Sequence, residues 1–241
     1  MINKNQVVIF GRHAVLAAIK NPARKIKKVL CVRENFEELK NLVSADKLQI
    51  TDRREIEKLL APDAVHQGFV MIADMLPAVS LEEICSRSEF LSDCHLVILD
   101  QVTDPQNIGA IIRSCAAFNS LALIVQDKNS PQESGSMLKA AAGTFENMPV
   151  CRVTNLVRAI EKLKQSGFWI IGMDGYAKAE IKDTDKRGKI AVIMGSEGKG
   201  MRRLTEENCD MCVRLPINPD VESLNVSTAA AIVLYELNRK E

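Results

Sequence analysis

The chain has 241 residues, of which 46% are hydrophobic and 26% charged, with a formal net charge of +1. This length and composition exclude an intrinsically disordered chain and allow one large domain or two modest ones. No apolar run reaches the roughly 20 residues of a membrane span and the polar start lacks a signal-peptide core, so we expect a cytoplasmic protein with no membrane partner. Its seven cysteines should then stay reduced.

The near-neutral charge hides a basic segment at the start of the chain. Eight Lys and Arg residues precede Glu34, and no Asp or Glu does. Such a local positive field is typical of surfaces that bind nucleic-acid phosphates, although a solvated basic helix and strand would have the same pattern. With only one Trp, two Tyr and seven Phe, the contact should be mainly electrostatic. The residues that we expect to contact RNA are Arg12, His13, Lys25, Lys27 and Lys28.

Residues 1–75 have the pattern of a small α/β domain. We predict strands at 7–10, 28–32 and 68–73, and helices at 13–19, 37–42 and 53–60. A polar stretch with Pro77 and a short helix at 81–87 follows, and we interpret residues 76–93 as a linker.

Strands and helices alternate through residues 94–241. We predict strands at 95–99, 121–125, 150–153, 169–173, 190–194 and 211–214, and helices at 105–118, 137–142, 156–165 and 226–237. Buried β-branched runs that alternate with helices are typical of a mostly parallel sheet with both faces covered. The predicted fold class is therefore α/β, in two domains.

The first of three motifs in the second domain begins a helix directly after a strand. Asp104 is a helix cap and Pro105 suits the first helical position. Asn107 and Arg113 then lie off the buried stripe of this helix, where they are free for chemistry. An ordinary amphipathic helix with a surface arginine remains the alternative.

The second and third motifs lie in predicted loops. Residues 195–200 follow a strand and hold three glycines around Glu197, which permits close approach of a ligand at the carboxyl end of a sheet. Their spacing matches neither a dinucleotide fingerprint nor a P-loop. The third motif offers three hydroxyls and an amide at the start of a helix, from Ser223, Asn225, Ser227 and Thr228. A structural turn and a solvated loop remain the alternatives.

Cys209 and Cys212 have the spacing of a metal-binding or redox pair. No second pair with zinc-site spacing exists among the cysteines and the three histidines. We therefore expect two buried thiols and no metal.

In this order the three motifs resemble those of the SpoU (TrmH-like) class of SPOUT RNA 2'-O-ribose methyltransferases. The similar segments are Asp104-Pro105-x-Asn107-x-Gly109-Ala110-x-x-Arg113-Ser114, Gly195-Ser196-Glu197-Gly198 and Ser223-Leu224-Asn225-Val226-Ser227. In addition, Phe10-Gly11-Arg12-His13 with His66-Gln67-Gly68 is similar to the L30e-like substrate-binding domain of that family. One departure is Asn119, where relatives usually have Gly after the first helix; Asn is the next-best residue for a left-handed helix end.

The resemblance implies a trefoil-knotted α/β domain that binds S-adenosyl-L-methionine, and a homodimer with the active site at its interface. The catalytic positions that it implies are Asn107, Arg113, Glu197 and Asn225. The cofactor-binding positions are Gly195, Ser196, Leu215, Ile217, Ser223 and Leu224. The substrate that it implies is a guanosine of 23S rRNA, as in the RlmB-like enzymes. A tRNA substrate, a non-catalytic RNA-binding or ribosome-assembly factor, and a nucleotide-cofactor enzyme with a Rossmann sheet remain alternatives.

Overall fold

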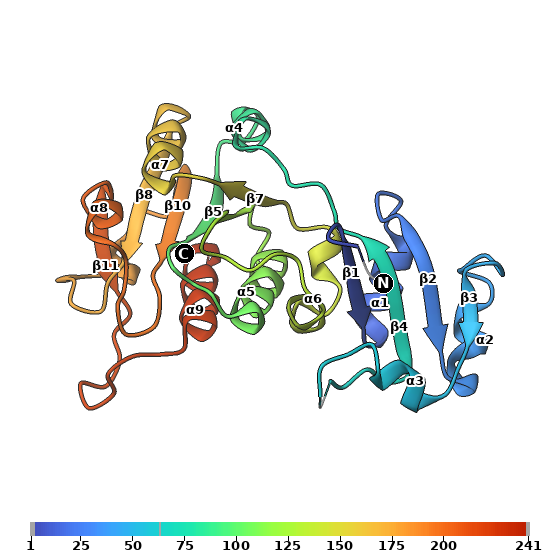
Figure 1. Cartoon of the computed structure of the whole chain (residues 1–241). Coiled ribbons are helices and arrows are strands. Elements are labelled where there is room, and N and C mark those ends of the chain that lie inside the picture. Colours follow the sequence, from blue (N-terminus) through green and yellow to red (C-terminus); the bar gives the residue numbers. More distant parts are fainter. Residues whose placement is uncertain (1–2, 63, 240–241) are drawn as a thin grey trace. The chain divides into compact units, whose positions relative to one another are not determined.

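The computed structural model describes residues 3–62 and 64–239, which fold into two compact units (Figure 1). The first unit combines the chain up to Pro77 with residues 132–146, and the second contains residues 78–131 and 147–241. The sequence interpretation placed residues 132–146 in the second domain, so the boundary differs there. Within the described ranges, no helix is both long enough and apolar enough to cross a membrane.

The first unit is built on a four-stranded sheet in the order β1-β4-β2-β3. β4 pairs antiparallel with β1 and β2, and β2 pairs parallel with β3. Its strands are β1 (Gln6–Phe10), β2 (Ile26–Cys31), β3 (Leu48–Ile50) and β4 (Phe69–Asp74). Its helices are α1 (Arg12–Lys20), α2 (Phe36–Leu39), α3 (Arg53–Glu57) and α6 (Gly135–Ala141), with 3-10 turns at Arg33–Asn35 and Thr144–Glu146. The sequence analysis missed β3, because three half-exposed residues carry no period of alternation.

The second unit is built on a seven-stranded sheet in the order β7-β6-β5-β10-β8-β11-β9. Every pairing between its strands is parallel, so the prediction of an α/β fold with a mostly parallel sheet is confirmed. The strands are β5 (Cys94–Leu99), β6 (Leu123–Gln126), β7 (Val150–Val153), β8 (Phe168–Met173), β9 (Ala179–Glu180), β10 (Lys189–Met194) and β11 (Met211–Arg214). The helices are α4 (Leu81–Glu89), α5 (Pro105–Ala117), α7 (Leu156–Gln165), α8 (Arg203–Glu206) and α9 (Val226–Asn238), with a 3-10 turn at Ile181–Asp183.

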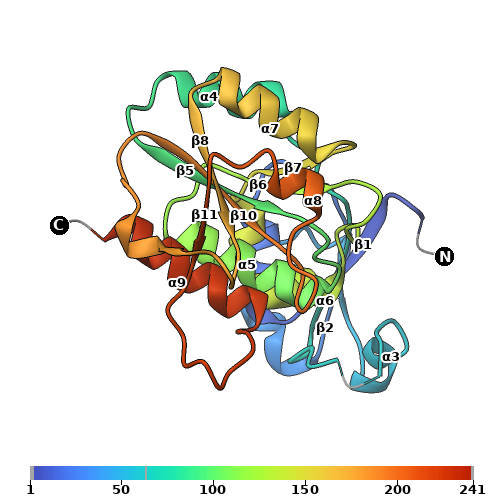
Figure 2. The ribbon, with the colours of Figure 1, turned by 90° about the vertical axis from the view of Figure 1, so that its left-hand side faces the viewer.

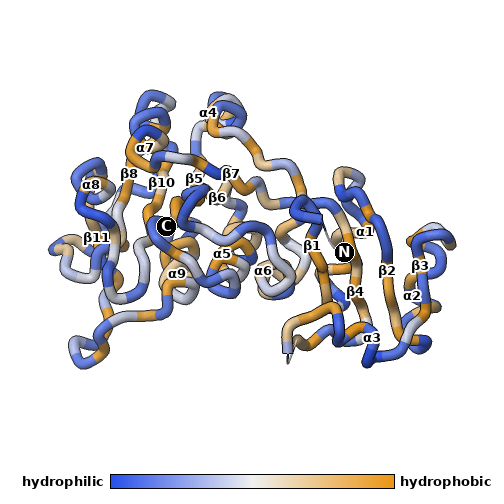
Figure 3. Tube along the Cα trace, in the orientation of Figure 1, coloured by the Kyte–Doolittle hydropathy of each residue, from blue (hydrophilic) through white to orange (hydrophobic). Residues whose placement is uncertain are grey.

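Helices cover both faces of this sheet. α4 and α7 lie on one face, and α5 and α9 lie side by side on the other (Figures 1 and 2). The central strand β10 is buried along all but its first residue, as expected for a strand covered on both sides. Figure 3 shows that the outer turns of α4 and α7 are hydrophilic.

Residues 76–93 do not form a linker. Ser80 caps α4, with its Oγ accepting a hydrogen bond from the Glu83 N–H. Ile84 and Cys85 of this helix are buried in the core of the second unit, in the same cluster as Leu156 and Ile160 of α7. The polar composition of the stretch concealed this packing, since only one narrow face of α4 points inward.

Residues 132–146 belong to the first unit because their packing is with β1 and α1. A Cβ atom built at Gly135 would lie 2.5 Å from the carbonyl oxygen of Val8, so only glycine allows α6 to lie this close to β1. Arg24, whose side chain is fully buried, donates to Glu133 Oε1 at 2.5 Å and to Glu146 Oε1 at 2.6 Å. One guanidinium therefore holds both ends of the segment.

Candidate functional site

The first motif lies where the sequence analysis placed it, at the start of α5. The carboxylate of Asp104 accepts hydrogen bonds from the N–H groups of Gln106 (3.2 Å) and Asn107 (3.1 Å), which confirms the predicted cap. The left-handed residue predicted after this helix is also confirmed, because Asn119 has φ 55°. These two ends fix where Asn107 stands relative to the carboxyl edge of the sheet.

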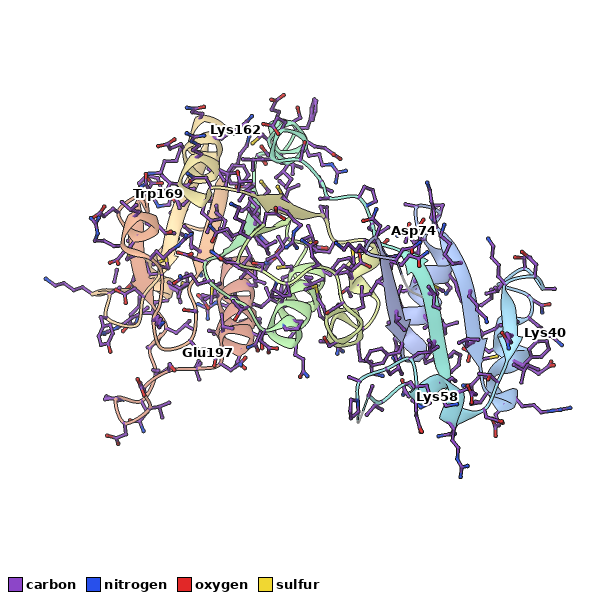
Figure 4. The ribbon with its side chains drawn as sticks, in the orientation of Figure 1. Lys40, Lys58, Asp74, Lys162, Trp169 and Glu197 are labelled. Carbon is purple, nitrogen blue, oxygen red and sulfur yellow. The ribbon has the colours of Figure 1, made fainter. Side chains whose placement is uncertain are left out.

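The glycine-rich motif forms a tight hairpin directly after β10. Ser196 and Gly200 exchange two backbone hydrogen bonds, of 3.1 and 2.9 Å. A Cβ atom at position 195 would lie 2.3 Å from the carbonyl carbon of Gly200, so the hairpin can close only with Gly195. Glu197 is held near the tip of this hairpin (Figure 4).

Asp100 and Arg202 anchor the base of the hairpin, and the sequence analysis missed both. Asp100 is fully buried at the end of β5 and accepts from the Arg202 backbone N–H (2.9 Å) and Nε (2.7 Å). A buried carboxylate needs such partners to offset its lost hydration. The charged residue directly after an apolar strand was the available signal.

Three of the four predicted catalytic residues meet in one hydrogen-bonded cluster. Glu197 Oε1 accepts from Asn225 Nδ2 at 2.7 Å, from the Val226 backbone N–H at 3.1 Å and from Asn107 Nδ2 at 3.4 Å. Asn225 Nδ2 also donates to Asn107 Oδ1 at 2.9 Å. The carboxylate lies at the first turn of α9, where unpaired N–H groups favour negative charge.

Asn225 joins this cluster to the fold through the other end of its amide. Its Oδ1 accepts from the backbone N–H groups of Ser227 (2.9 Å) and Thr228 (3.4 Å), which makes Asn225 the cap of α9. The cap fixes the orientation of the amide and therefore points Nδ2 at Glu197 and Asn107.

Arg113 does not join the cluster. It follows Asn107 by six residues on α5, which corresponds to roughly 9 Å along the helix axis. Its side chain is exposed, and within residues 3–62 and 64–239 it makes no hydrogen bond or ion pair. A permanently charged guanidinium that has no partner in the described part of the chain is available to a ligand or to another molecule.

A pocket opens beside the cluster. Its volume of about 450 Å³ lies in the usual range for small-molecule sites. All six residues predicted to bind the cofactor line it: Gly195, Ser196, Leu215, Ile217, Ser223 and Leu224. The sequence analysis missed Tyr176 and Arg214, which also line it from segments at the carboxyl ends of β8 and β11. Carboxylates outnumber cations in the lining, with Asp174, Glu197, Glu206 and Glu222 against Lys199 and Arg214.

The residues predicted to contact RNA lie on the surface of the first unit. His13, Lys25 and Lys28 are exposed. Arg12 pairs with Glu38, and Lys27 pairs with Asp74 at 3.0 Å and lowers the pKa of that carboxyl through their hydrogen bond. Arg24, which the sequence analysis counted in the basic segment, is buried and does not contribute to a positive surface.

The predicted thiol pair lies half-buried in the second unit. A Cβ atom at Gly172 would lie 2.8 Å from Cys209 Sγ and 3.2 Å from Cys212 Sγ. Burial raises the pKa of Cys209 to about 12, so this thiol stays protonated at neutral pH. In the part of the chain that the structure describes, no group of three His, Cys, Asp or Glu side chains could hold a metal ion.

Comparison with known proteins matches the chain along nearly its whole length. The model of the SpoU rRNA Methylase family matches residues 95–235, and that for RNA 2'-O ribose methyltransferase substrate binding matches residues 8–79. The 23S rRNA (guanosine-2'-O-)-methyltransferase RlmB of Pseudomonas syringae pv. tomato is 40% identical over 243 residues, covering 96% of this chain and 95% of the relative. RlmB of Escherichia coli K12 is 35% identical over 241 residues, covering 97% and 98%.

A solved structure has the same fold. The SpoU methyltransferase AviRb from Streptomyces viridochromogenes, in complex with the cofactor AdoMet, superimposes with a TM-score of 0.82 at 22% identity, covering 97% of this chain and 89% of that one.

Proposed function

Because the chain belongs to the SpoU rRNA methylase family, we propose that it transfers a methyl group from S-adenosylmethionine to the ribose 2'-hydroxyl of a guanosine in 23S rRNA. The observation that carries the proposal is the pocket beside the Asn107–Glu197–Asn225 cluster, lined by all six residues expected for the cofactor. The predictions of the family, of the enzyme class and of the cofactor are confirmed by the family membership.

The charge of the pocket fits this cofactor. S-adenosylmethionine supplies a methyl group on a positively charged sulfonium, and its amino-acid end adds an ammonium and a carboxylate. The excess of carboxylates in the lining favours the net positive ligand, while Lys199 is available to its carboxylate and Arg214 is paired with Glu180 at 3.4 Å. The hairpin of residues 195–200 and the start of α9 form the walls that hold it.

The hydrogen-bonded cluster acts by positioning the groups around it. Glu197 accepts three hydrogen bonds, so its carboxylate has one fixed orientation and holds the hairpin against α5 and α9. Methyl transfer is an in-line displacement, in which the attacking oxygen must stand behind the methyl carbon. Fixed positions of this kind can contribute about 7 to 11 kcal/mol of the rate enhancement.

Arg113 is proposed as the residue that acts on the attacking hydroxyl. A guanidinium stays protonated in proteins, so it cannot serve as a simple base. It can instead bridge the 2'-oxygen and the adjacent phosphate and stabilise the developing alkoxide electrostatically, with the proton passing to phosphate or water. Its exposure and its lack of a partner among residues 3–62 and 64–239 support a role toward a bound molecule.

We further propose a homodimer in which α5 and α9 face the second copy. α9 exposes the apolar side chains of Ile232 (42% exposed) and Tyr235 (56%), and the Tyr235 ring contacts Phe118 edge-on, next to the end of α5. Exposed apolar groups on adjoining helices are suited to a self-complementary interface. In that arrangement Arg113 of one copy would serve the pocket of the other.

The first unit is proposed to bind the RNA, with the second unit binding the cofactor. Residues 8–79 match the substrate-binding model of the family, and His13, Lys25 and Lys28 offer exposed donors for phosphate contacts. Arg12 and Lys27 would first have to release their carboxylate partners, so we expect them to contribute less. We also propose that the protein acts in the cytoplasm, in keeping with an rRNA substrate.

The test is transfer of labelled methyl groups to unmodified 23S rRNA and to unmodified tRNA in parallel, mapped by resistance to alkaline cleavage. We expect one protected ribose, in 23S rRNA alone. Label in tRNA alone would overturn the proposal of an rRNA substrate. RNA binding without methyl transfer would favour a non-catalytic factor. A chelator in the same assay should leave transfer unchanged, in keeping with the prediction that no metal takes part.

A further inference from the structure

Lys139 is a partly buried cation of the first unit. It lies on α6, and its Nζ donates to Gln67 Oε1 at 2.9 Å. Residues 3–62 and 64–239 give it no ion pair, whereas Arg12, Arg24 and Lys27 each have one. Its position is over Gly11, where an added Cβ atom would lie 2.5 Å from Nζ. Burial lowers the pKa of Lys139, as expected for an ammonium that has lost part of its hydration.

Gln67 is the second part of this arrangement. Its Oε1 also accepts from the Arg12 backbone N–H at 3.2 Å, and its carbonyl oxygen accepts from Asn35 Nδ2 at 2.9 Å. Its backbone has φ 55°, the left-handed region that glycine adopts without strain. The side chain is exposed, and its Nε2 donates to no described residue. The turn thus presents, beside the Lys139 ammonium, two N–H donors that have no acceptor among residues 3–62 and 64–239.

The ion cluster at Arg24 holds Lys139 in place. Arg24 binds Glu133 and Glu146, which flank α6 on its two sides. Asn21 Nδ2 adds a hydrogen bond of 2.8 Å to Glu146, and the Leu76 N–H adds one of 3.0 Å to Glu133. α6 is therefore fixed before any ligand arrives, which lowers the entropic cost of binding through Lys139.

We propose that Lys139 and Gln67 together bind a backbone phosphate of the RNA substrate. A phosphate offers the negative charge that the ammonium lacks and the acceptor oxygens that the free donors of both side chains require. Lys139 lies within the match to the methylase model, at residues 95–235, yet it acts from the substrate-binding unit. The inference rests on the proposed function for the identity of the RNA.

The first experiment compares RNA binding of Lys139→Met and Lys139→Arg with that of the wild-type chain across a salt titration, using an unmodified 23S rRNA transcript. Lys139→Met should raise the Kd about tenfold and make the slope of log K against log salt shallower by about 0.7 to 0.9, because one phosphate contact is lost. Lys139→Arg should keep most of the slope. The Kd for S-adenosylmethionine should stay unchanged in both.

Lys40→Met is the matched control, because it removes the same charge from a lysine that is paired with Glu37 at 2.5 Å. It should leave the RNA salt slope unchanged. A wild-type slope in Lys139→Met, or an equal change in Lys40→Met, would overturn the assignment. The two proposals can fail separately, because this experiment measures RNA binding. A wild-type chain that transfers no methyl group would overturn the proposed function, whereas the phosphate contact of Lys139 would still be decided by the binding measurements.

Gln67→Glu separates binding from a structural bridge. Glutamate keeps an oxygen for Lys139 and the Arg12 N–H, so a merely structural role predicts an unchanged or higher Tm and unchanged RNA binding. The proposal predicts the same Tm but a Kd for RNA raised about tenfold, because the variant loses the Nε2 donors and adds a negative charge. Wild-type affinity in Gln67→Glu would remove Gln67 from the contact.

Discussion

The two units assemble their polar groups in different ways. In the second unit, Asn107, Glu197 and Asn225 each belong to a short contiguous motif at a strand end or a helix start. In the first unit, Arg24 gathers Glu133 and Glu146 from more than a hundred residues away, and Gln67 meets Lys139 across 72 residues.

This difference separates two kinds of site. A parallel sheet brings the carboxyl ends of its strands to one edge, so motifs that follow predicted strands can be expected to converge there. The first unit has no such rule, because residues 132–146 leave the unit that surrounds them in sequence and pack on β1 and α1. We therefore expect substitutions at the motifs of the second unit to alter methyl transfer, and substitutions in the buried Arg24 cluster to alter the folding stability of the first unit.

The largest effect is expected from Arg24→Met. The variant keeps the aliphatic stem but leaves two carboxylates buried without their cation, which should lower the free energy of unfolding by about 3 to 5 kcal/mol. Urea denaturation measures this, and hydrogen exchange should show the loss in α1 and α6. The control is Lys27→Met, whose pair with Asp74 is at the surface, so that its loss should lower the free energy of unfolding much less. Equal losses of unfolding free energy in the two variants would contradict the proposed role of Arg24 in stabilising the first unit.

Among the substitutions in the second unit, Arg113→Ala should have the largest effect on the rate of methyl transfer. Removing one charge-stabilising donor typically lowers kcat by about 10²- to 10³-fold. Because Arg113 does not line the cofactor pocket, the Kd for S-adenosylmethionine should stay the same. Single-turnover rates and calorimetric titration measure the two quantities. A matched loss of turnover and cofactor affinity would rule out the proposed role.

Substitution of Asn225 tests the cluster and the helix cap separately. Asn225→Ala removes the cap of α9 and should cost about 0.5 to 2 kcal/mol of stability, along with cofactor affinity. Asn225→Asp keeps a capping oxygen but places a second carboxylate against Glu197, so it should weaken cofactor binding with a smaller loss of stability. Thermal unfolding and cofactor titration distinguish the two variants. Unaltered cofactor affinity in both would exclude Asn225 from the site.

The smallest effect is a pH dependence in the first unit. Burial raises the pKa of Glu133 above its usual value of 4.5, despite the opposing effect of Arg24. Between the pKa of Glu133 in the unfolded chain and its higher pKa in the folded chain, the folded state binds more protons than the unfolded state. The free energy of unfolding should therefore fall as pH rises through this window. The fall should reach up to about 1.4 kcal/mol per unit of difference between the two pKa values. Glu133→Gln should remove this decline in a denaturation series over pH. Parallel curves for the two proteins would disprove the effect.

Local patterns identified most elements of the chain. The alternation of apolar runs and helical periods located every strand of the parallel sheet except the two-residue β9, and Asp104 and Asn119 marked the two ends of α5. The motif residues around Gly195 and Asn225 were found because their spacing in the sequence resembles that of a known family. The trefoil knot that this resemblance implies is a path of the chain through a loop, which no local pattern encodes, and it stays a prediction.

The sequence by itself determined most of the helices, the principal strands and the three contiguous motifs, because periodicity and capping act between neighbouring residues. Only the tertiary structure decided that residues 76–93 pack into a core, that Asp100 holds Arg202, and that Lys139 stands beside Gln67. Each of these depends on which distant groups burial brings together. A buried charge needs a partner, and the fold can supply that partner from a distant part of the chain. Such a pair produces no periodic pattern in the sequence that could reveal it.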